Sequence, residues 1–280
     1  MKYFKNKGIK MAELSHAFNS PSPYQPTQVL SYTTEELLQK GYLVIPCGTQ
    51  EEAKLCLKIN AVVETIKEFY WMNFQLIGVN VDKEGAIPPF FIHYPKENAY
   101  YAPKLKHFAF DNKFASRPDI VCHEMTHAVI AYHNPLQYKG ESGALDEAIA
   151  DVAAIAFKQY KSTSPNDWQI GNLRNLSNIP EKFKSSPTYN LGNDFGYVHD
   201  NSLIISHTFY LASKNLSHDS THCKLLFNIW FKSMLALGDK SFKGFKAKTI
   251  QVANEDIHTV GRIVINAISD AWEQTSPLFP

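Results

Sequence analysis

The segment "CHEMTHAVIAYHN", residues 122 to 134, carries three histidines and one glutamate. His123 and His127 are four residues apart, so on a helix their rings lie on one face, one turn apart, with Glu124 beside them. Two histidines at this spacing can hold a zinc ion, and a neighbouring carboxylate can act as a general base. A pair of helix histidines held by ordinary neighbours is the alternative interpretation of the same residues.

A second segment supplies what an open zinc site needs besides two histidines. Glu147 follows His127 on the next predicted helix and can provide a third ligand, which leaves the fourth position to water. Asp151 lies one turn further and can accept the free ring N–H of one ligating histidine. The helix also contains small residues that favour a close approach to another helix, namely Gly143, Ala144, Ala148 and Ala150.

The blocks "HEMTHAV", "ESGALDEAIAD" and "GYVHDNSLIIS" resemble, in this order, the three signature blocks of the thermolysin-like zinc metalloendopeptidases, or gluzincins. The resemblance runs from about residue 52 to the C-terminus. It implies one Zn²⁺ held by His123, His127 and Glu147, and a zinc-bound water activated by Glu124 as general base. Asp146 stands where the family commonly has asparagine and is expected beside His127.

The same resemblance implies further catalytic residues. Tyr138 and His199 match the residues that hydrogen-bond the developing oxyanion, and Asp194 matches the carboxylate that orients that histidine.

The substrate-binding residues come from two parts of the chain. Asn98 and the backbone of Ala99, in "NAYYAP", match a strand edge that aligns an extended peptide, and Arg174 matches a residue that grips its carbonyl. Ile120 and Leu173 are expected to line the pocket for the apolar residue after the scissile bond.

One departure from the family concerns structural calcium. The stretch after the third ligand has Lys158 where a ligand carboxylate is expected, and Gln169 and Asn172 in place of further acids. Calcium needs six to eight oxygen ligands, mostly anionic. We therefore expect this calcium to be absent and Lys158 to pair with Asp119 instead.

The elements that must position these residues follow from hydrophobic periodicity and turn signals. A capping box at Thr49 predicts a helix ending near Met72, whose buried face holds Leu55, Ile59, Val62, Ile66 and Phe69. Short β-rich runs at 41–48, 74–81 and 89–94 predict strands of a small sheet. Helical periodicity then predominates from Arg117 onward, at 118–133, 142–160, 201–214, 221–238 and 258–272.

These elements predict a two-lobed α+β fold, thermolysin-like, with a reduced sheet-containing N-terminal lobe, a helical C-terminal lobe and zinc in the cleft between. Residues 1–30 are expected to be a poorly ordered arm, which could block the cleft. Residues 31–132 form the first lobe, including the His-Glu-x-x-His helix, and residues 133–280 the second.

The composition of the chain limits the kinds of partner that it is expected to bind. The 280 residues carry 28 Lys+Arg against 27 Asp+Glu, so no charge excess indicates nucleic acid, and no apolar run of membrane-spanning length occurs. We expect a peptide or protein substrate, and no oligomeric state can be predicted. No secretion signal is recognisable, which predicts a cytoplasmic protein as synthesised, with export by another route left open. The four cysteines are irregularly spaced, which favours reduced thiols.

The function predicted from these residues is a zinc-dependent endopeptidase that cuts before apolar residues. A catalytically silent binding protein or effector with the same fold is the alternative from another class, because the shortened first lobe could leave the site too loose for turnover. An aminopeptidase is disfavoured because the glycine and Met-Glu-Asn motif that holds a free amino terminus is missing.

Overall fold

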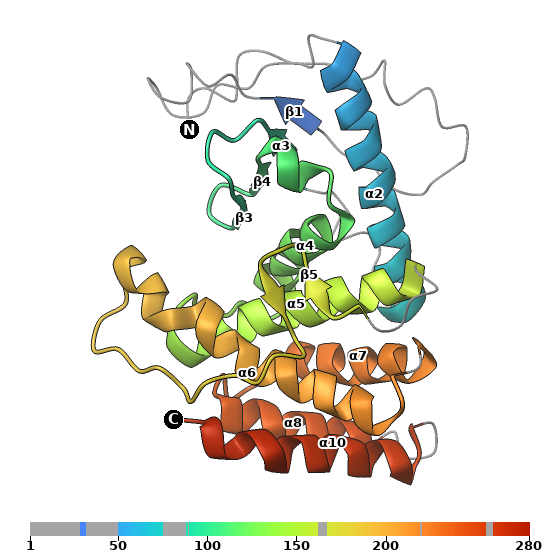
Figure 1. Ribbon diagram of the computed structural model, residues 1–280, viewed down its shortest axis with the longest axis vertical. Helices are drawn as coiled ribbons and strands as arrows, with labels where there is room; N and C mark the ends of the chain where they lie inside the picture. Colours follow the sequence, from blue (N-terminus) through green and yellow to red (C-terminus); the bar gives the residue numbers. More distant parts are fainter. Residues whose placement is uncertain are drawn as a thin grey trace. The chain divides into compact units, whose positions relative to one another are not determined.

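The structure is a computed structural model that describes residues 29–31, 50–74, 88, 90–161, 167–218, 220–255 and 260–280. The chain forms two compact units, and Figure 1 shows their helices and strands. Unit 1 comprises Met1–Trp71 and Gln75–Arg117, and unit 2 comprises Met72–Phe74 and Pro118–Pro280. The boundary predicted after residue 132 placed the His-Glu-x-x-His helix in the first lobe, whereas its contacts group it with the helical unit that starts at Pro118.

The long helix α2 (Gln50–Phe74) lies mostly in unit 1. Its start at Gln50 agrees with the predicted helix, but its buried face is turned slightly from the expected one. Ile59, Ile66 and Phe69 are buried as predicted. Cys56 and Val63 are buried in place of their neighbours Leu55 and Val62, which are half-buried. The helical period was therefore right and its phase was wrong by one residue at two of the five positions.

Unit 1 also holds a four-stranded sheet in the order β1-β2-β4-β3. Its strands are β1 (Val29–Ser31), β2 (Phe90–Ile92), β3 (Ala99–Ala102) and β4 (His107–Phe110), followed by the short helix α3 (Asn112–Ala115). Strands β1, β2 and β4 are parallel, and β3 pairs antiparallel with β4 at one edge. The predicted strand at 89–94 is confirmed by β2. The run at 41–48, residues 1–28 of the predicted arm and all of the run at 74–81 except Phe74, which ends α2, lie outside the described residues.

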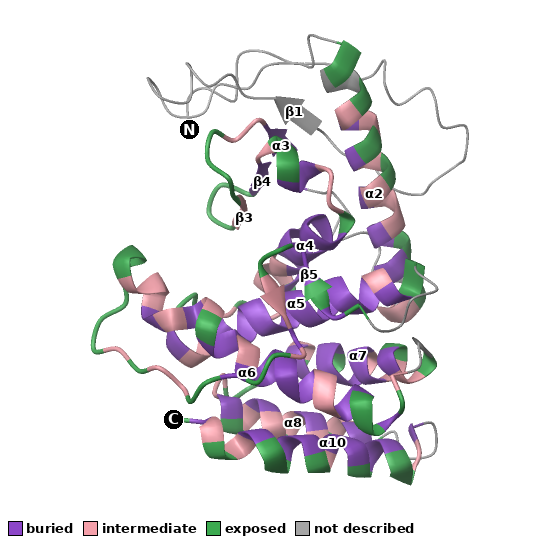
Figure 2. Cartoon of the chain, viewed as in Figure 1, coloured by how far each residue is buried: buried purple, intermediate pink, exposed green. Residues whose placement is uncertain are grey.

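Unit 2 is helical and is built around α5 (Gly140–Lys161). Helix α5 packs against α4 (Pro118–His133), α6 (Asp194–Asn215) and α7 (Ser220–Leu235), and Figure 2 shows it buried along most of its length. The remaining elements are the hairpin β5 (Gln169–Ile170) and β6 (Arg174–Asn175), the helices α8 (Phe242–Glu255) and α10 (Arg262–Thr275), and the 3₁₀ turns η2 (Leu191–Asn193) and η3 (Ser276–Leu278).

All five helices predicted after Arg117 are present, but α8 and the hairpin were missed. In α8 every second or third residue from Lys243 to Lys248 is lysine, and the helix buries only Phe242, Phe245, Thr249 and Ala253. Its apolar stripe is therefore narrow. The indole rings of Trp230 and Trp272 stack beneath it with centroids 5.9 Å apart, which places α8 firmly in the core of unit 2.

The cysteines differ from the prediction. Cys122 and Cys223 are free and buried, but Cys56 is disulfide-bonded, so the expectation of reduced thiols was wrong for this residue. Cys47, the remaining cysteine, lies outside the described residues.

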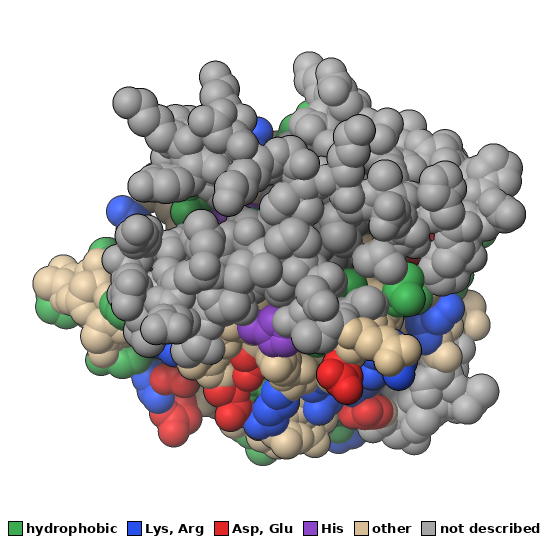
Figure 3. Space-filling model, turned by 90° about the horizontal axis from the view of Figure 1, so that it is seen from above, with side chains coloured by type: hydrophobic (Ala, Val, Ile, Leu, Met, Phe, Trp, Pro, Cys, Tyr) green, Lys and Arg blue, Asp and Glu red, His purple; other side chains and the backbone are tan. Residues whose placement is uncertain are grey.

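Surface charge and hydropathy agree with the composition. On the face drawn in Figure 3, acidic and basic side chains interleave on the described part of the surface instead of forming a patch of one sign. Within the described ranges, none of the helices combines the length and the apolar content that crossing a bilayer would require.

Candidate active site

Helix α4 is the platform of the site. It starts at Pro118, whose fixed φ suits a first helical turn, and Asp119 in that turn complements the helix dipole. Most of the helix is buried, including His123 and Glu124, each 6% exposed. Cys122 points away from the histidines: its Sγ lies 3.8 Å from the carbonyl oxygen of Ala153 on α5. Cys122 is therefore a packed residue.

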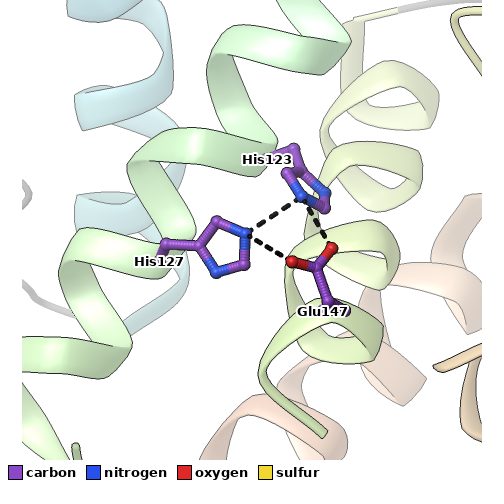
Figure 4. A group of neighbouring side chains, drawn as sticks. All are labelled: His123, His127 and Glu147. Atoms are coloured by element: carbon purple, nitrogen blue, oxygen red, sulfur yellow. Dashed lines mark hydrogen bonds and ion pairs between the residues drawn. The ribbon is translucent and has the colours of Figure 1, made fainter. Parts of the chain in front are cut away.

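Two histidines of α4 and one glutamate of α5 converge (Figure 4). The Nε2 atoms of His123 and His127 are 3.0 Å apart. Glu147 Oε2 lies 3.3 Å from His123 Nε2, and its Oε1 lies 3.5 Å from His127 Nε2. Ligands at about 2.0–2.1 Å around a tetrahedral zinc ion stand about 3.3–3.4 Å apart. The three separations are close to this spacing, with each histidine facing a different oxygen of the Glu147 carboxylate.

The other ring nitrogens face carboxylates. His127 Nδ1 lies 2.8 Å from Asp146 Oδ1, and His123 Nδ1 lies 2.9 Å from Asp151 Oδ1. A proton on each Nδ1, directed at its carboxylate, leaves each Nε2 with a lone pair aimed at the other. Two lone pairs at 3.0 Å repel unless a cation lies between them. The donor set therefore fits a zinc ion.

The electrostatics of His123, His127 and Glu147 also favour a bound cation. Burial disfavours an ionised Glu147, yet His127, His123 and His199 hold the pKa of its carboxyl well below the usual range. Burial likewise opposes protonation of His123, but Asp151 and Glu147 raise its pKa to about 10. The buried carboxylates thus stabilise positive charge at the rings, and a divalent cation would supply it.

Arg174 completes the support. Its Nε and Nη2 donate to the two oxygens of Asp151 at 2.8 and 2.6 Å, a bidentate pair, and Nη2 lies 3.5 Å from Glu147 Oε2. Against burial, Arg174 and His123 lower the pKa of Asp151. Arg174 is therefore not a solvated surface charge: it fixes the carboxylate that faces His123.

Glu124 is placed differently from the three ligand candidates. It follows His123 on α4, is buried, and does not belong to the group whose ligand atoms lie within 4.8 Å of one another. Burial raises the pKa of its carboxyl, although His123 and His127 oppose the shift. A carboxyl held beside a metal site but outside its ligand set suits a group that exchanges a proton with a reactant.

A second group of side chains lies on the other side of Glu147. Tyr138 Oη donates to Glu147 Oε1 at 2.5 Å and lies 3.5 Å from His199 Nε2. His199 Nδ1 lies 2.9 Å from both oxygens of Asp194. The structure therefore brings Tyr138, His199 and Asp194 together, with Asp194 against the His199 ring as the sequence predicted. Tyr138 is 40% exposed, and the His199 side chain is 43% exposed.

The backbone that carries Asp194 and His199 is unusual. Asp194, Phe195, Gly196 and Tyr197 all have positive φ, at 50°, 51°, 96° and 59°. A left-handed conformation costs a non-glycine residue roughly 1–2 kcal/mol. The turn directs the Asp194 carboxylate back to the backbone N–H of His199, 3.0 Å away, as well as to its ring.

A family model and several known proteins are similar to this chain. The family model described as "Thermolysin metallopeptidase, alpha-helical domain" matches residues 134–276, just over half of the chain. The chain belongs to the thermolysin metallopeptidase family. Thermolysin-like proteins are zinc-dependent, in agreement with the donor set of His123, His127 and Glu147.

Relatives cover different shares of this family member. It is 29% identical to an extracellular metalloprotease of Pectobacterium carotovorum subsp. carotovorum over 246 residues, which is 74% of this chain and 68% of that protein. It is 37% identical to thermolysin of Alicyclobacillus acidocaldarius subsp. acidocaldarius over 120 residues, only 22% of that protein. The precursor of protealysin, a metalloproteinase from Serratia proteamaculans, shares the fold, with a TM-score of 0.66, 21% identity, and 93% of this chain and 91% of that chain covered.

Lys158 and Asp119, which the sequence predicted to pair in place of a structural calcium, have other partners in the structure. Lys158 Nζ lies 2.6 Å from Asp167 Oδ2 and donates to the carbonyl of Gln169 at 2.5 Å. Asp119 Oδ2 accepts the backbone N–H of Gly171 at 2.8 Å. Lys158 thus finds its carboxylate on the segment just before β5, because that segment passes closer to its ammonium than the start of α4 does.

The predicted substrate-binding residues fall in both units. Ile120 is buried in unit 2, while Leu173 is 53% exposed at the turn between β5 and β6. Asn98 directly precedes β3, the edge strand of unit 1, and Ala99 is its first residue. An edge strand can accept an extended peptide, and the roles of these four residues stay predictions.

Sequence reasoning named Gly143 but missed Gly140 and Gly196, the other two glycines near the second group. A Cβ on Gly143 would lie 2.7 Å from Val198 Cγ1, so this glycine allows α5 to approach α6, not the α4 partner that its position suggested. Gly140 and Gly196 both have positive φ. The only available signal was a glycine in "YKGE" and another in "DFGY", and a single glycine does not specify its neighbours.

Proposed function

We propose that this chain is a zinc endopeptidase. The observation that carries the proposal is the convergence of His123 Nε2, His127 Nε2 and the Glu147 carboxylate at separations of 3.0 to 3.5 Å, close to the spacing of zinc ligands. Glu124 lies directly after His123 in the chain. Family membership supports a peptide or protein substrate. One zinc ion is the proposed cofactor.

Zinc in such a site lowers the pKa of water to about 7 and polarises a carbonyl group. Glu124 takes the proton from the attacking water and passes it to the leaving amine. Its burial favours this exchange, because a raised carboxyl pKa brings base and acid forms closer in energy near neutral pH.

Three residues of the second group complete the reaction. Tyr138 Oη and His199 Nε2 are 3.5 Å apart and can both donate to the oxyanion that forms as water adds to the carbonyl. Asp194 accepts the Nδ1 proton of His199 and, against burial and together with Glu147, raises the pKa of the ring. The imidazolium form also carries a proton on Nε2, which it can donate to the substrate.

Substrate selection is the finer part of the proposal. An extended peptide adds to β3 at Asn98 and Ala99 through backbone hydrogen bonds, which give affinity without demanding a sequence. Ile120 and Leu173 favour an apolar residue after the scissile bond, and Arg174 lies beside Glu147 where it can grip the adjoining carbonyl.

We propose further that the family's structural calcium is replaced by a cation of the chain. Lys158 stands where the resemblance places a ligand carboxylate, and it contacts Asp167 and the Gln169 carbonyl, so a cation of the chain takes up these oxygens. The melting temperature of the zinc-loaded protein is then independent of added calcium. A rise of several degrees with millimolar calcium would contradict this replacement.

The test of the function is digestion of an unfolded protein by the zinc-loaded chain, with cut sites identified by mass spectrometry. Glu124→Gln keeps the size of the side chain and is expected to lower the rate about 100- to 10,000-fold. Glu273→Gln, on a side chain 77% exposed in α10, is the matched control and leaves the rate unchanged. Cuts before Leu, Ile or Phe support the pocket. Equal cutting by Glu124→Gln, or none by the wild type, would refute the proposal.

A further inference from the structure

The turn loop, residues 186–197, holds Asp194 in its left-handed conformation and also carries Tyr189, which the mechanism above does not use. Tyr189 is 50% exposed, large and aromatic. Its ring lies against the two glycines of positive φ that flank the second group. A Cβ built on Gly196 would stand 2.8 Å from both Cδ1 and Cε1 of Tyr189, and one on Gly140 would stand 3.2 Å from Cε1.

These two glycines belong to the segments that present the oxyanion donors. Gly140 comes two residues after Tyr138 and begins α5, while Gly196 lies inside the turn between Asp194 and His199. The segments themselves nearly touch, since a Cβ on Gly196 would be 3.3 Å from the backbone nitrogen of Gly140. One flat ring thus contacts both segments at the point of their closest approach.

The turn loop is built to hold that ring in place. The side-chain amide of Asn193 donates to Ser186 Oγ and to the carbonyl of Thr188, both at 2.8 Å, and its oxygen accepts from the backbone of Asn190 at 3.0 Å. The residues on either side of Tyr189 are therefore fixed to the residue that precedes Asp194. Lys139, next to Tyr138, adds a cation–π contact, with its Nζ 5.6 Å from the centre of the Tyr189 ring.

The segment of Tyr138 is anchored on its other side by unit 2 itself. The Asn134 amide donates to the carbonyls of Met234 and Leu237 at 2.8 and 2.9 Å. Glu141 Oε2 accepts the first backbone N–H of α8, from Phe242, at 2.7 Å. These anchors hold the Tyr138 segment to the rest of unit 2, but they do not set its distance from His199. The Tyr189 ring lies against both segments and can set that distance.

We propose that Tyr189 is a positioning residue that holds the two oxyanion donors, Tyr138 and His199, at their mutual distance. The inference rests on the proposed function and deepens it: the ring acts through Gly140 and Gly196, not on the substrate. Ring carbons make the nearest approach to both glycines, and the hydroxyl oxygen comes second at Gly140, so the aromatic ring is expected to matter more than the hydroxyl. A shift of about 1 Å between catalytic groups can cost about a hundredfold in rate.

The experiment compares zinc-loaded wild type, Tyr189→Ala and Tyr189→Phe on one peptide substrate. Tyr189→Ala is expected to lower kcat about 10- to 100-fold and to leave KM within about threefold, because the donors act on the transition state. Tyr189→Phe is expected to stay within about twofold of wild type, since it retains the ring. Tyr160→Ala, on a side chain 39% exposed near the end of α5, is the matched control and retains full kcat.

Two further measurements separate positioning from general structural damage. Zinc affinity, by competition with a chromophoric chelator, is expected to be unchanged in Tyr189→Ala. The affinity for a phosphonamidate peptide, which mimics the tetrahedral anion, is expected to fall in parallel with kcat. If Tyr189→Ala fails to fold, Tyr189→Leu is used in its place, with a kcat expected between those of the Phe variant and an inactive enzyme.

The inference is overturned if the Ala or Leu variant keeps wild-type kcat, or if Tyr189→Phe loses as much kcat as Tyr189→Ala. It is also overturned if zinc affinity and kcat fall together, because the residue would then support the fold of the site as a whole. A wild type that cleaves nothing would instead refute the proposed function, so the two failures can be told apart.

Discussion

The two halves of the site are built in different ways. The metal half, His123, His127 and Glu147, sits on the consecutive helices α4 and α5 and is almost completely buried. The oxyanion half, Tyr138 and His199, is half-exposed and depends on a loop and a left-handed turn. Regular helices place the first half through spacing alone, whereas the second needs contacts from residues distant in sequence. The predictions below separate the halves by asking which variants change zinc affinity and which change turnover.

The largest effect is expected in the metal half. His127→Ala removes one of three protein ligands, so zinc affinity is expected to fall by at least about 1000-fold. Competition with a chromophoric chelator measures it. His133→Ala is the matched control, because this histidine lies on the same helix, in its last turn, and outside the ligand group. A comparable loss of zinc in His133→Ala would contradict the assignment.

Turnover without loss of metal is the expected signature of the oxyanion half. His199→Gln is expected to lower kcat about 100-fold, the usual cost of one missing donor, while zinc affinity stays within about threefold. Steady-state kinetics and the same chelator competition give both values for one preparation. Should zinc affinity drop as steeply as kcat, the two halves would not be separable at this residue.

A smaller change in zinc affinity is expected from the carboxylate behind His127. Asp146→Asn keeps the size of the side chain that contacts His127 Nδ1 at 2.8 Å but removes its charge. Affinity for zinc is expected to fall about 10- to 100-fold. Asp167→Asn, 51% exposed beside Lys158, is the control without effect on zinc. Unchanged affinity in Asp146→Asn would show that the amide supports the ring equally well.

The smallest effect concerns the stability of the turn. Gly196→Ala places a side chain at φ 96° and within 2.8 Å of the Tyr189 ring. The free energy of unfolding is expected to drop by about 1–2 kcal/mol, measured by urea denaturation. Gly238→Ala, where a Cβ meets nothing within 4 Å, is the control. An unaltered unfolding curve for Gly196→Ala would mean that the turn relaxes without cost.

Prediction from sequence succeeded where periodicity decides the structure. The spacing of His123 and His127, and of Glu147 and Asp151, fixes which faces of α4 and α5 carry them, and the structure brings these side chains within ligand and hydrogen-bond distances. A small sheet including β2, and six of the described helices (α2 and the five after Arg117), were predicted for the same reason, since apolar residues recur at the period of each element.

What the sequence could not predict depends on contacts between distant residues. Nothing local in "YKGE" and "DFGY" indicates that Gly140 and Gly196 meet under the ring of Tyr189. Lys158 was expected to pair with Asp119, but its carboxylate partner is Asp167, which the course of the chain after α5 brings close. The disulfide bond of Cys56 was missed because irregular cysteine spacing carries no information on distance in space.

The central claim is that His123, His127 and Glu147 hold one zinc ion for a reaction in which Glu124 exchanges the proton. Native mass spectrometry of wild type and Glu124→Gln during zinc titration, with peptide hydrolysis followed in the same samples, tests it most directly. The account predicts one zinc per chain in both proteins with equal affinity, and hydrolysis by the wild type alone. Weaker zinc binding by Glu124→Gln, or equal hydrolysis by both proteins, would contradict it.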